Sequence, residues 1–146
     1  MTEPAENRAS LMPILTALAV VGVALIAVFA LRMVRGGSAL PDEVAVRRAA
    51  VGQNDALQRQ DYADFRSFTC TAQQGSESGV ITAQRDTTSA RGARYVDDVK
   101  DVSVTGDRAT ATVVYHFEKA GDDKVASPMT FVRENGGWKV CSPGPR

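Results

Sequence analysis

The sequence predicts an α+β domain that follows one membrane-spanning helix, and three observations lead to this fold class. An uncharged apolar run covers residues 11–31, a helix-compatible stretch begins at residue 41, and four alternating apolar and polar runs follow residue 94. A long apolar run is typical of a spanning helix, and a period of two is typical of half-buried strands. We therefore expect one N-terminal transmembrane helix, then helices packed on a four-stranded antiparallel sheet.

The apolar run at residues 11–31 is long enough to cross a bilayer. As a helix it would reach roughly 31 Å, the thickness of the hydrocarbon core, and Pro13 would lie in its first turn, where proline is tolerated. A buried helix of a soluble domain and a cleaved signal peptide are the alternatives, the latter because small or aliphatic residues occupy positions 28 and 30. Arg32 and Arg35 directly follow the run and favour an uncleaved signal-anchor.

The remaining chain divides into short polar segments and one domain. Residues 1–10 predict a disordered tail, and residues 32–40, which include Gly36-Gly37-Ser38, predict a short linker to a domain at 41–146. Without its first 37 residues the chain has a net charge of about −1, with the two signs interspersed. This composition excludes the basic surface typical of nucleic-acid binding, so we expect no nucleic-acid partner.

The two cysteines help to predict on which side of the membrane the domain lies. Cys70 and Cys141 are far apart in sequence and belong to no CxxC motif or histidine cluster, so a metal site is not expected. An isolated pair in a small domain is typical of a structural disulfide in an oxidising compartment, although two unpaired buried thiols are the alternative. The arginines after the apolar run favour a cytoplasmic domain. The cysteine pair favours the opposite side. We give the cysteines more weight and expect an extracytoplasmic domain.

Three helices are expected between residues 41 and 92. Pro41-Asp42-Glu43 is typical of a first helical turn, and small residues at 45, 49, 52 and 56, with Val44, Val51 and Leu57 beside them, predict a helix to about Arg59 that approaches a sheet closely. Asp61 predicts the cap of a second helix that ends near Cys70. A third is expected from Val80 to Arg91, closed by Gly92.

Four strands are expected after Gly92, at residues 95–105, 108–119, 125–134 and 138–142. The turn signals between them are Gly106-Asp107, Gly121-Asp122-Asp123 and Asn135-Gly136-Gly137. In the second strand one face carries Ala109, Ala111, Val113, Tyr115 and Phe117, and the other carries Thr110, Thr112, Val114, His116 and Glu118. The first face is expected to meet the helices.

Three segments carry a resemblance to a known superfamily: residues 61–70 (DYADFRSFTC), 101–113 (DVSVTGDRATATV) and 137–141 (GWKVC). With the element order, they resemble the nuclear transport factor 2-like (cystatin-like cone) superfamily, and more closely actinobacterial single-pass membrane proteins with an extracytoplasmic domain of this type. The resemblance covers about residues 40–142. It implies a curved, cone-shaped sheet around a long helix, with a pocket at its mouth, and members that are mostly accessory or binding proteins.

A ligand pocket in such a cone would be lined by inward aromatic residues, and six are candidates: Tyr62, Phe65, Tyr95, Tyr115, Phe117 and Trp138. Isomerases and cyclases of the superfamily use a carboxylate with tyrosine or acid donors in an apolar pocket. The corresponding candidates here are Asp61, Asp64, Tyr62, Tyr95, Tyr115 and His116. None has a specific spacing signal. Helix capping explains Asp61, and a place in the first turn of the same helix explains Asp64.

The expected function is therefore non-enzymatic. The chain lacks a GxSxG motif and a glycine-rich phosphate loop, so no catalytic residue, cofactor or metal is expected. We expect a membrane-anchored extracytoplasmic domain that binds a partner protein or a small apolar ligand, as an accessory of a cell-envelope complex. A pocket enzyme of the isomerase or cyclase type is the alternative, and a homodimer through the sheet face of Thr110, Thr112, Val114 and His116 is a further expectation.

Overall fold

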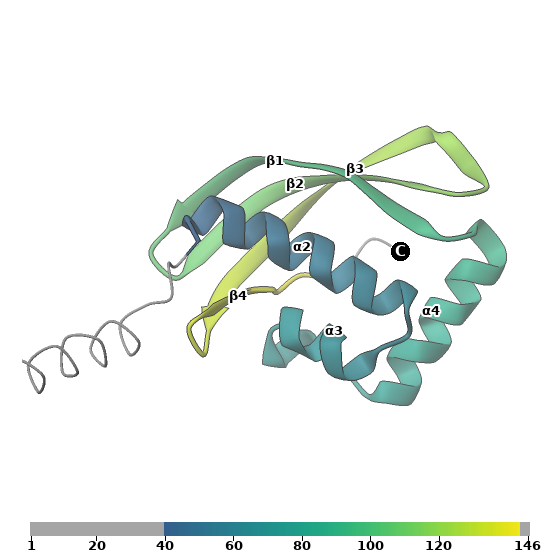
Figure 1. Cartoon of the computed structure of the whole chain (residues 1–146), viewed down its shortest axis with the longest axis horizontal. Coiled ribbons are helices and arrows are strands. Elements are labelled where there is room, and N and C mark those ends of the chain that lie inside the picture. Colours follow the sequence, from purple (N-terminus) through teal and green to yellow (C-terminus); the bar gives the residue numbers. More distant parts are fainter. Residues whose placement is uncertain (1–39, 144–146) are drawn as a thin grey trace, which may run out of the picture. The chain divides into compact units, whose positions relative to one another are not determined.

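A four-stranded antiparallel sheet with the strand order β1-β2-β3-β4 forms one layer of the structure, and helices cover one of its faces (Figure 1). The computed structural model describes residues 40–143. The helices are α2 (Asp42–Gln58), α3 (Tyr62–Phe68), the 3-10 helix η1 (Thr71–Gln73) and α4 (Glu77–Arg91), and the strands are β1 (Arg94–Thr105), β2 (Arg108–Phe117), β3 (Ala120–Glu134) and β4 (Gly137–Val140). The predicted α+β class, with three α-helices packed on a four-stranded antiparallel sheet, is confirmed.

The predicted membrane anchor at residues 11–31 lies outside the described residues. Among the helices of residues 40–143, none is long and apolar enough to cross a membrane. The anchor and the orientation of the domain stay predictions.

Helix α2 lies along the sheet with a narrow buried stripe. Asp42 and Glu43 occupy its first turn, where negative charge interacts favourably with the helix dipole. Ala49 and Ala50 are 2 and 4 % exposed, and their small side chains allow the helix to pack closely on the sheet. Val44 and Val51, which the sequence placed beside this stripe, are exposed, because the buried side of the helix is turned toward Val46 and Gln53.

The ends of α3 and α4 follow from local chemistry. The Asp61 side chain accepts a hydrogen bond from the Asp64 backbone N–H at 2.9 Å, which confirms the predicted cap. Helix α4 begins at Glu77, three residues before the predicted start, because Ser76 supplies the N-cap. Gly92 ends α4 as predicted, with φ of +81°, and a Cβ there would lie 2.7 Å from the Glu118 Cβ, so this position requires glycine.

The hairpin between β2 and β3 turns at a different place from the predicted one. Phe117 pairs with Ala120, so the turn lies at residues 118–119 rather than at Gly121-Asp122-Asp123. The reason is the anchoring of this turn to the end of α4. The Glu118 N–H donates to the Ala93 carbonyl at 2.8 Å and the Lys119 N–H donates to the Arg91 carbonyl at 3.2 Å.

The hydrophobic core lies between α2 and the sheet. The predicted inward face of β2, from Ala109 to Phe117 in steps of two, is buried at every position, whereas the opposite face is half-buried or exposed. Core residues from the other elements are Val46, Ala49, Ala50, Val99, Met129, Phe131, Trp138 and Val140. The alternation of β2 therefore places the sheet against the helices, as its pattern predicts.

A disulfide joins Cys70 and Cys141, with the two Cα atoms 5.2 Å apart. Next to it, the Cys70 N–H donates to the Val140 carbonyl at 2.9 Å, and Thr69 forms a parallel bridge with Val140. The predicted pairing is confirmed. It links the end of α3 to the end of β4.

The start of α2 is tied to the last hairpin through one carboxylate. The Asp42 Oδ1 atom accepts hydrogen bonds from the Trp138 Nε1–H at 3.0 Å and from the Arg133 guanidinium at 2.8 Å. The hydrogen bond from Trp138, followed by the one from Arg133, holds the pKa of Asp42 below its ordinary value, and partial desolvation opposes this shift. The first helical turn is therefore held against β3 and β4.

We expect the Trp138→Phe substitution to raise the pKa of Asp42, because it removes the Nε1–H donor. In the folded wild-type chain the lowered pKa stabilises the fold above the unfolded-state pKa of about 3.9, and this contribution is lost as the pH falls through the folded-state pKa. Carboxyl NMR titration measures the shift. The Arg47→Gln substitution is the control, because Arg47 lies on the same helix and pairs with Asp98 instead. An unchanged Asp42 titration in Trp138→Phe would contradict this assignment.

Candidate functional site

A cavity of about 470 Å³ lies between the helices and the beginning of the sheet, and we call it the α2–α4 cavity. Its volume falls within the range of small-molecule sites. The lining comes from α2, α3, η1, α4, β1 and the segment after β4, and consists of Gln53, Leu57, Phe65, Gln73, Val80, Ala83, Gln84, Thr87, Arg94, Ser142 and Pro143.

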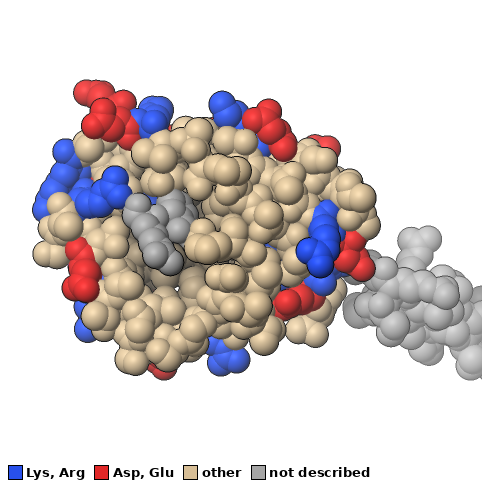
Figure 2. All heavy atoms as spheres, turned by 180° about the vertical axis from the view of Figure 1, so that it is seen from behind, with Lys and Arg blue, Asp and Glu red and all other residues tan. Residues whose placement is uncertain are grey.

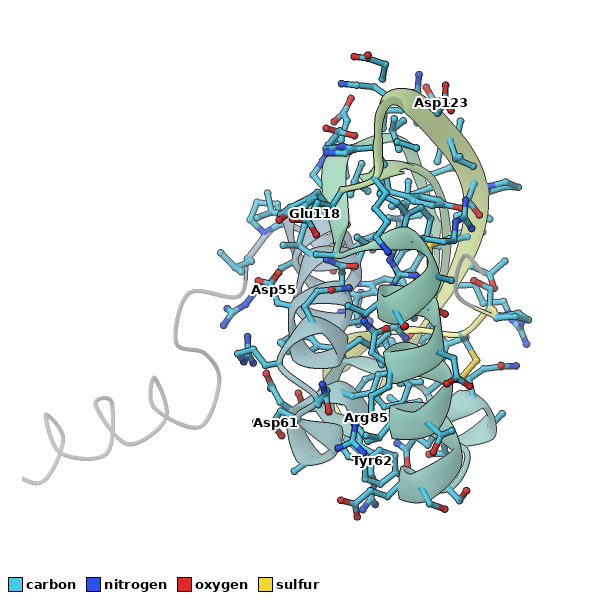
Figure 3. The ribbon with its side chains drawn as sticks, turned by 90° about the vertical axis from the view of Figure 1, so that its right-hand side faces the viewer. Asp55, Asp61, Tyr62, Arg85, Glu118 and Asp123 are labelled. Carbon is cyan, nitrogen blue, oxygen red and sulfur yellow. A yellow bond between two sulfur atoms is a disulfide. The ribbon has the colours of Figure 1, made fainter. Side chains whose placement is uncertain are left out.

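One wall of the α2–α4 cavity is a single face of α4. Val80, Ala83, Gln84 and Thr87 recur at spacings of three and four residues, which places them on one side of a helix. Figure 3 shows α4 to the right of α2. The wall is apolar at Val80 and Ala83 and offers amide and hydroxyl groups at the other two positions.

Polar side chains from α2 and β1 form the inner end of the cavity. Arg94 is 7 % exposed, and its Nε–H donates to the Asn54 Oδ1 atom at 2.8 Å, while the Asn54 amide donates to the Arg94 carbonyl at 3.2 Å. Gln53 is 5 % exposed and donates to the Thr69 hydroxyl at 2.8 Å. Gln53 and Arg94 also line a void of about 10 Å³ toward the core.

The electrostatics of Arg94 reflect its burial. Its guanidinium carbon lies 5.9 Å from the centre of the Tyr115 ring. Desolvation lowers the pKa of Arg94 from its ordinary value, and the Coulombic effect of Tyr115 opposes this. An arginine side chain nevertheless stays protonated under physiological conditions, so a buried positive charge lies at the inner end of the cavity.

The six predicted pocket residues do not meet in one site. Phe65 lines the α2–α4 cavity. Tyr115 and Phe117 form an edge-to-face pair in the core with ring centres 5.7 Å apart. The Trp138 Nε1–H donates a hydrogen bond to Asp42 near the start of α2. The remaining two of the six, Tyr62 and Tyr95, lie outside the lining of this cavity. The period of two identified the buried face of the strand, but not which part of that face borders a cavity.

The two other tyrosine candidates point elsewhere. Tyr95 is 49 % exposed and stacks on His116, with ring centres 5.3 Å apart. The Tyr62 hydroxyl donates to the Gly75 carbonyl at 2.6 Å. Neither side chain lines the α2–α4 cavity.

The two candidate catalytic carboxylates, Asp61 and Asp64, take part in local contacts at the start of α3. Figure 3 shows Asp61 and Tyr62 at one end of the molecule, near Arg85. Asp61 caps α3, and Asp64 pairs with Arg59. Neither carboxylate lines the α2–α4 cavity.

His116 belongs to a cluster on the face of the sheet that the helices leave open. Its Nδ1 atom lies 2.8 Å from Asp97 Oδ2, and Lys124 lies 3.5 Å from the other Asp97 oxygen. The hydrogen bond with His116 is the main cause that lowers the pKa of Asp97. Asp97 lies between Val96 and Asp98, where the β1–β2 register shifts, which places it beside His116.

Charges of both signs surround the face seen in Figure 2. Lysine, arginine, aspartate and glutamate side chains alternate around its edge, and the described part of its centre is uncharged. Among the described residues of this face, no patch of one sign is gathered. The expectation that nucleic acid is not a partner stays a prediction.

Sequence reasoning missed Gln53, Asn54 and Arg94 as site residues. The first two continue the buried stripe of α2 at three- and four-residue spacing from Ala49 and Ala50, and this spacing was the available signal. Arg94 precedes the strand predicted at residues 95–105 and, as a charged residue next to a turn, is typical of a surface position.

A long helix packed on an antiparallel sheet, with a cavity between them, defines the class of this protein. This architecture agrees with the fold that the resemblance to the nuclear transport factor 2-like (cystatin-like cone) superfamily implies. Residues 73–142 match the model of the family described as low molecular weight antigen MTB12, C-terminal domain. No curated protein was found to match the chain.

Solved structures of similar architecture come from several bacteria. A Campylobacter jejuni protein, provisionally described as an NTF2-like transpeptidase, is 15 % identical with a TM-score of 0.46, over 64 % of this chain and 94 % of that one. An uncharacterised cystatin-fold protein from Novosphingobium aromaticivorans is 13 % identical with a TM-score of 0.44, over 64 and 93 % of the two chains. A Streptomyces avermitilis protein, provisionally described as a dehydratase of the NTF2-like family, is 21 % identical with a TM-score of 0.44, over 68 and 88 %. At these identities no activity is transferred to the present chain.

Proposed function

We propose that this protein is a non-enzymatic binding protein that holds a small, mainly apolar ligand in the α2–α4 cavity. The observation that carries the proposal is the composition of the cavity lining. Leu57, Phe65, Val80, Ala83 and Pro143 supply apolar surface, and amide, hydroxyl and guanidinium groups supply a few polar contacts. Apolar walls with a small number of polar groups are typical of ligand sites.

The same lining argues against the isomerase or cyclase alternative. Those reactions need a general base, usually a carboxylate or histidine, within hydrogen-bond reach of the substrate. The described lining contains no aspartate, glutamate, histidine or tyrosine. The residues of the cavity can bind and orient a ligand, but among them we find no group suited to take a proton from it.

We further propose that the domain acts outside the cytoplasm, next to a membrane. The apolar run at residues 11–31 supports the tether. The disulfide between Cys70 and Cys141 supports an oxidising compartment. A binding domain in this place would deliver or retain its ligand at the cell envelope, as an accessory of an envelope complex.

The test uses a soluble fragment, residues 40–146, and the neutral probe N-phenyl-1-naphthylamine. The fragment is suitable because these residues form a compact unit with their own core and disulfide. We expect saturable binding with a fluorescence increase. The Ala83→Trp substitution should weaken binding at least tenfold, about 1.4 kcal/mol, because the indole would occupy the cavity.

The matched control is Ala90→Trp. Ala90 is exposed on the same helix and does not line the α2–α4 cavity, so this variant should bind the probe like the unmodified fragment. Thermal unfolding of both variants checks that the fold is kept. Absence of saturable binding, or equal binding by the Ala83→Trp variant, would reject the cavity as a ligand site.

A further inference from the structure

We infer that the ligand of the α2–α4 cavity is a neutral molecule with an apolar body and a hydroxyl group, and that this hydroxyl donates a hydrogen bond to the Gln53 Oε1 atom. This inference rests on the proposed function and names the chemical class of its ligand. The observations behind it are the orientation of the Gln53 amide, the hydrogen bonds of two other lining residues, and the absence of acidic residues from the described lining.

The orientation of the Gln53 amide is fixed by Thr69. The Thr69 hydroxyl donates its proton to the Phe65 carbonyl at 2.7 Å, so toward any second neighbour it can only accept a hydrogen bond. That neighbour is the Gln53 amide, whose Nε2–H donates to Thr69 at 2.8 Å. Because the amide nitrogen must face Thr69, the Oε1 atom lies on the other side of the amide.

The Gln53 Oε1 atom accepts no hydrogen bond from residues 40–143, although Gln53 is only 5 % exposed. Leaving a buried amide oxygen without a donor is costly. In the described part of the chain, the one fully enclosed side-chain polar atom that lacks a partner is the Gln58 Nε2 atom, so the Gln53 oxygen borders open space. The void of about 10 Å³ beside Gln53 is barely large enough for one water. A ligand donor can therefore reach this oxygen from the α2–α4 cavity.

Two polar residues of the α4 wall also present acceptors. The Gln84 Nε2–H donates to the Thr88 hydroxyl at 3.1 Å, and the Thr87 hydroxyl donates its proton to the Ala83 carbonyl at 2.8 Å. These bonds leave the amide oxygen of Gln84 and the hydroxyl oxygen of Thr87 for a ligand, and an oxygen can bind only a donor. Gln84 is 8 % exposed, so its oxygen, like that of Gln53, is poorly hydrated.

The charge of the lining favours a neutral donor. A hydroxyl and an ammonium group can both donate to an amide oxygen, but a buried ammonium needs an anion nearby to offset its lost hydration. The described lining contains no aspartate or glutamate. The apolar body of the ligand has its own surface on Leu57, Phe65, Val80 and Ala83. Alcohols and phenols with an apolar body share this chemistry.

The decisive experiment compares two competitors that differ in one proton donor. 4-Butylphenol carries a hydroxyl, and in 4-butylanisole a methyl group replaces the hydroxyl proton. Each compound is used to displace N-phenyl-1-naphthylamine from the fragment 40–146. We expect the phenol to bind about tenfold more tightly, because the anisole leaves a buried acceptor unpaired. The cation 4-butylbenzylamine should displace the probe no better than the anisole.

The Gln53→Met substitution tests the assigned acceptor. Methionine is of similar length and lacks the amide oxygen, so the affinities for the phenol and the anisole should come within about twofold of each other. The matched control is Gln58→Met, on the same helix and outside the lining, which should keep the tenfold ratio. The anisole methyl group is present in every comparison, so a change in the ratio reports the hydrogen bond and not the bulk of the ligand. Thermal unfolding checks that both variants fold.

The outcomes separate this inference from the proposed function. If the anisole or the benzylamine displaces the probe as well as the phenol, or if none of the three displaces it, the hydroxyl class is wrong and the apolar site stands. If Gln53→Met folds and keeps the ratio, the assignment of Gln53 is wrong. If the probe itself does not bind, the proposed function fails.

A spectroscopic measurement covers the case in which Gln53→Met does not fold. The side-chain carbonyl carbon of Gln53 is then followed by NMR in the unmodified fragment. The phenol should shift this signal more than the anisole does, because only the phenol donates to the Oε1 atom. Equal shifts with the two compounds would overturn the inference.

Discussion

Replacing both Cys70 and Cys141 with alanine is expected to lower the free energy of unfolding by about 4 kcal/mol. The disulfide closes a loop with a sequence separation of 71 residues, and in the chain-entropy model a loop of this length restricts the unfolded chain by roughly that amount. For a domain of about 100 residues this is a large part of the total stability. Urea unfolding of the fragment 40–146 measures the change.

A reductant supplies the matched control for this prediction. Dithiothreitol should destabilise the unmodified fragment by a similar amount and leave the double alanine variant unchanged. Cys70 is fully buried beside Val140, so the alanine variant also loses some packing and should be the less stable of the two. A loss below about 1 kcal/mol in both cases would show that the link between α3 and β4 contributes little to the fold.

The Phe131→Ala substitution is expected to cost about 3–5 kcal/mol, the range for removing a fully buried aromatic side chain. Phe131 is 1 % exposed, belongs to the core cluster and lies on β3 between its partners Ala109 on β2 and Val140 on β4. Its removal would leave a cavity between α2 and the sheet that small alanine side chains on α2 cannot fill. Denaturant unfolding measures the loss.

The control for this variant is Val125→Ala on the same strand. Val125 is 37 % exposed, and substitutions at such positions usually change stability by no more than about 0.5 kcal/mol. Equal losses in the two variants would contradict the placement of Phe131 in the core. An unchanged denaturant slope would show that both variants unfold from the same compact state.

Local patterns predicted the elements well, because the groups that define them are close together in the chain. Asp61 caps α3 and Gly92 ends α4 through contacts within a few residues. The inward face of β2 follows from the pleat of a single strand. The position of the β2–β3 turn did not follow from the sequence, because hydrogen bonds to the end of α4 select residues 118–119 over the stronger local signal at 121–123.

The candidate site was much harder to predict. The resemblance predicts that inward aromatic residues line a pocket, yet Tyr115 and Phe117 fill the core and Tyr95 lies on the outer face of the sheet. No local pattern marks Arg94 as a site residue, because a charged residue beside a turn is typical of a surface position. Whether a side chain borders a cavity depends on how three helices meet the sheet. No local pattern carries that information.

The sequence by itself determined the α+β class, the cap of α3, the end of α4, the buried face of β2 and the resemblance to the superfamily. All of these depend on periodicity or on groups near in the chain. Only the tertiary structure decided that the two cysteines form a disulfide, that Asp42 holds the last hairpin, and that Arg94 lies buried at the inner end of the α2–α4 cavity. These features join residues from 40 to almost 100 positions apart, and packing of the helices on the sheet brings them together.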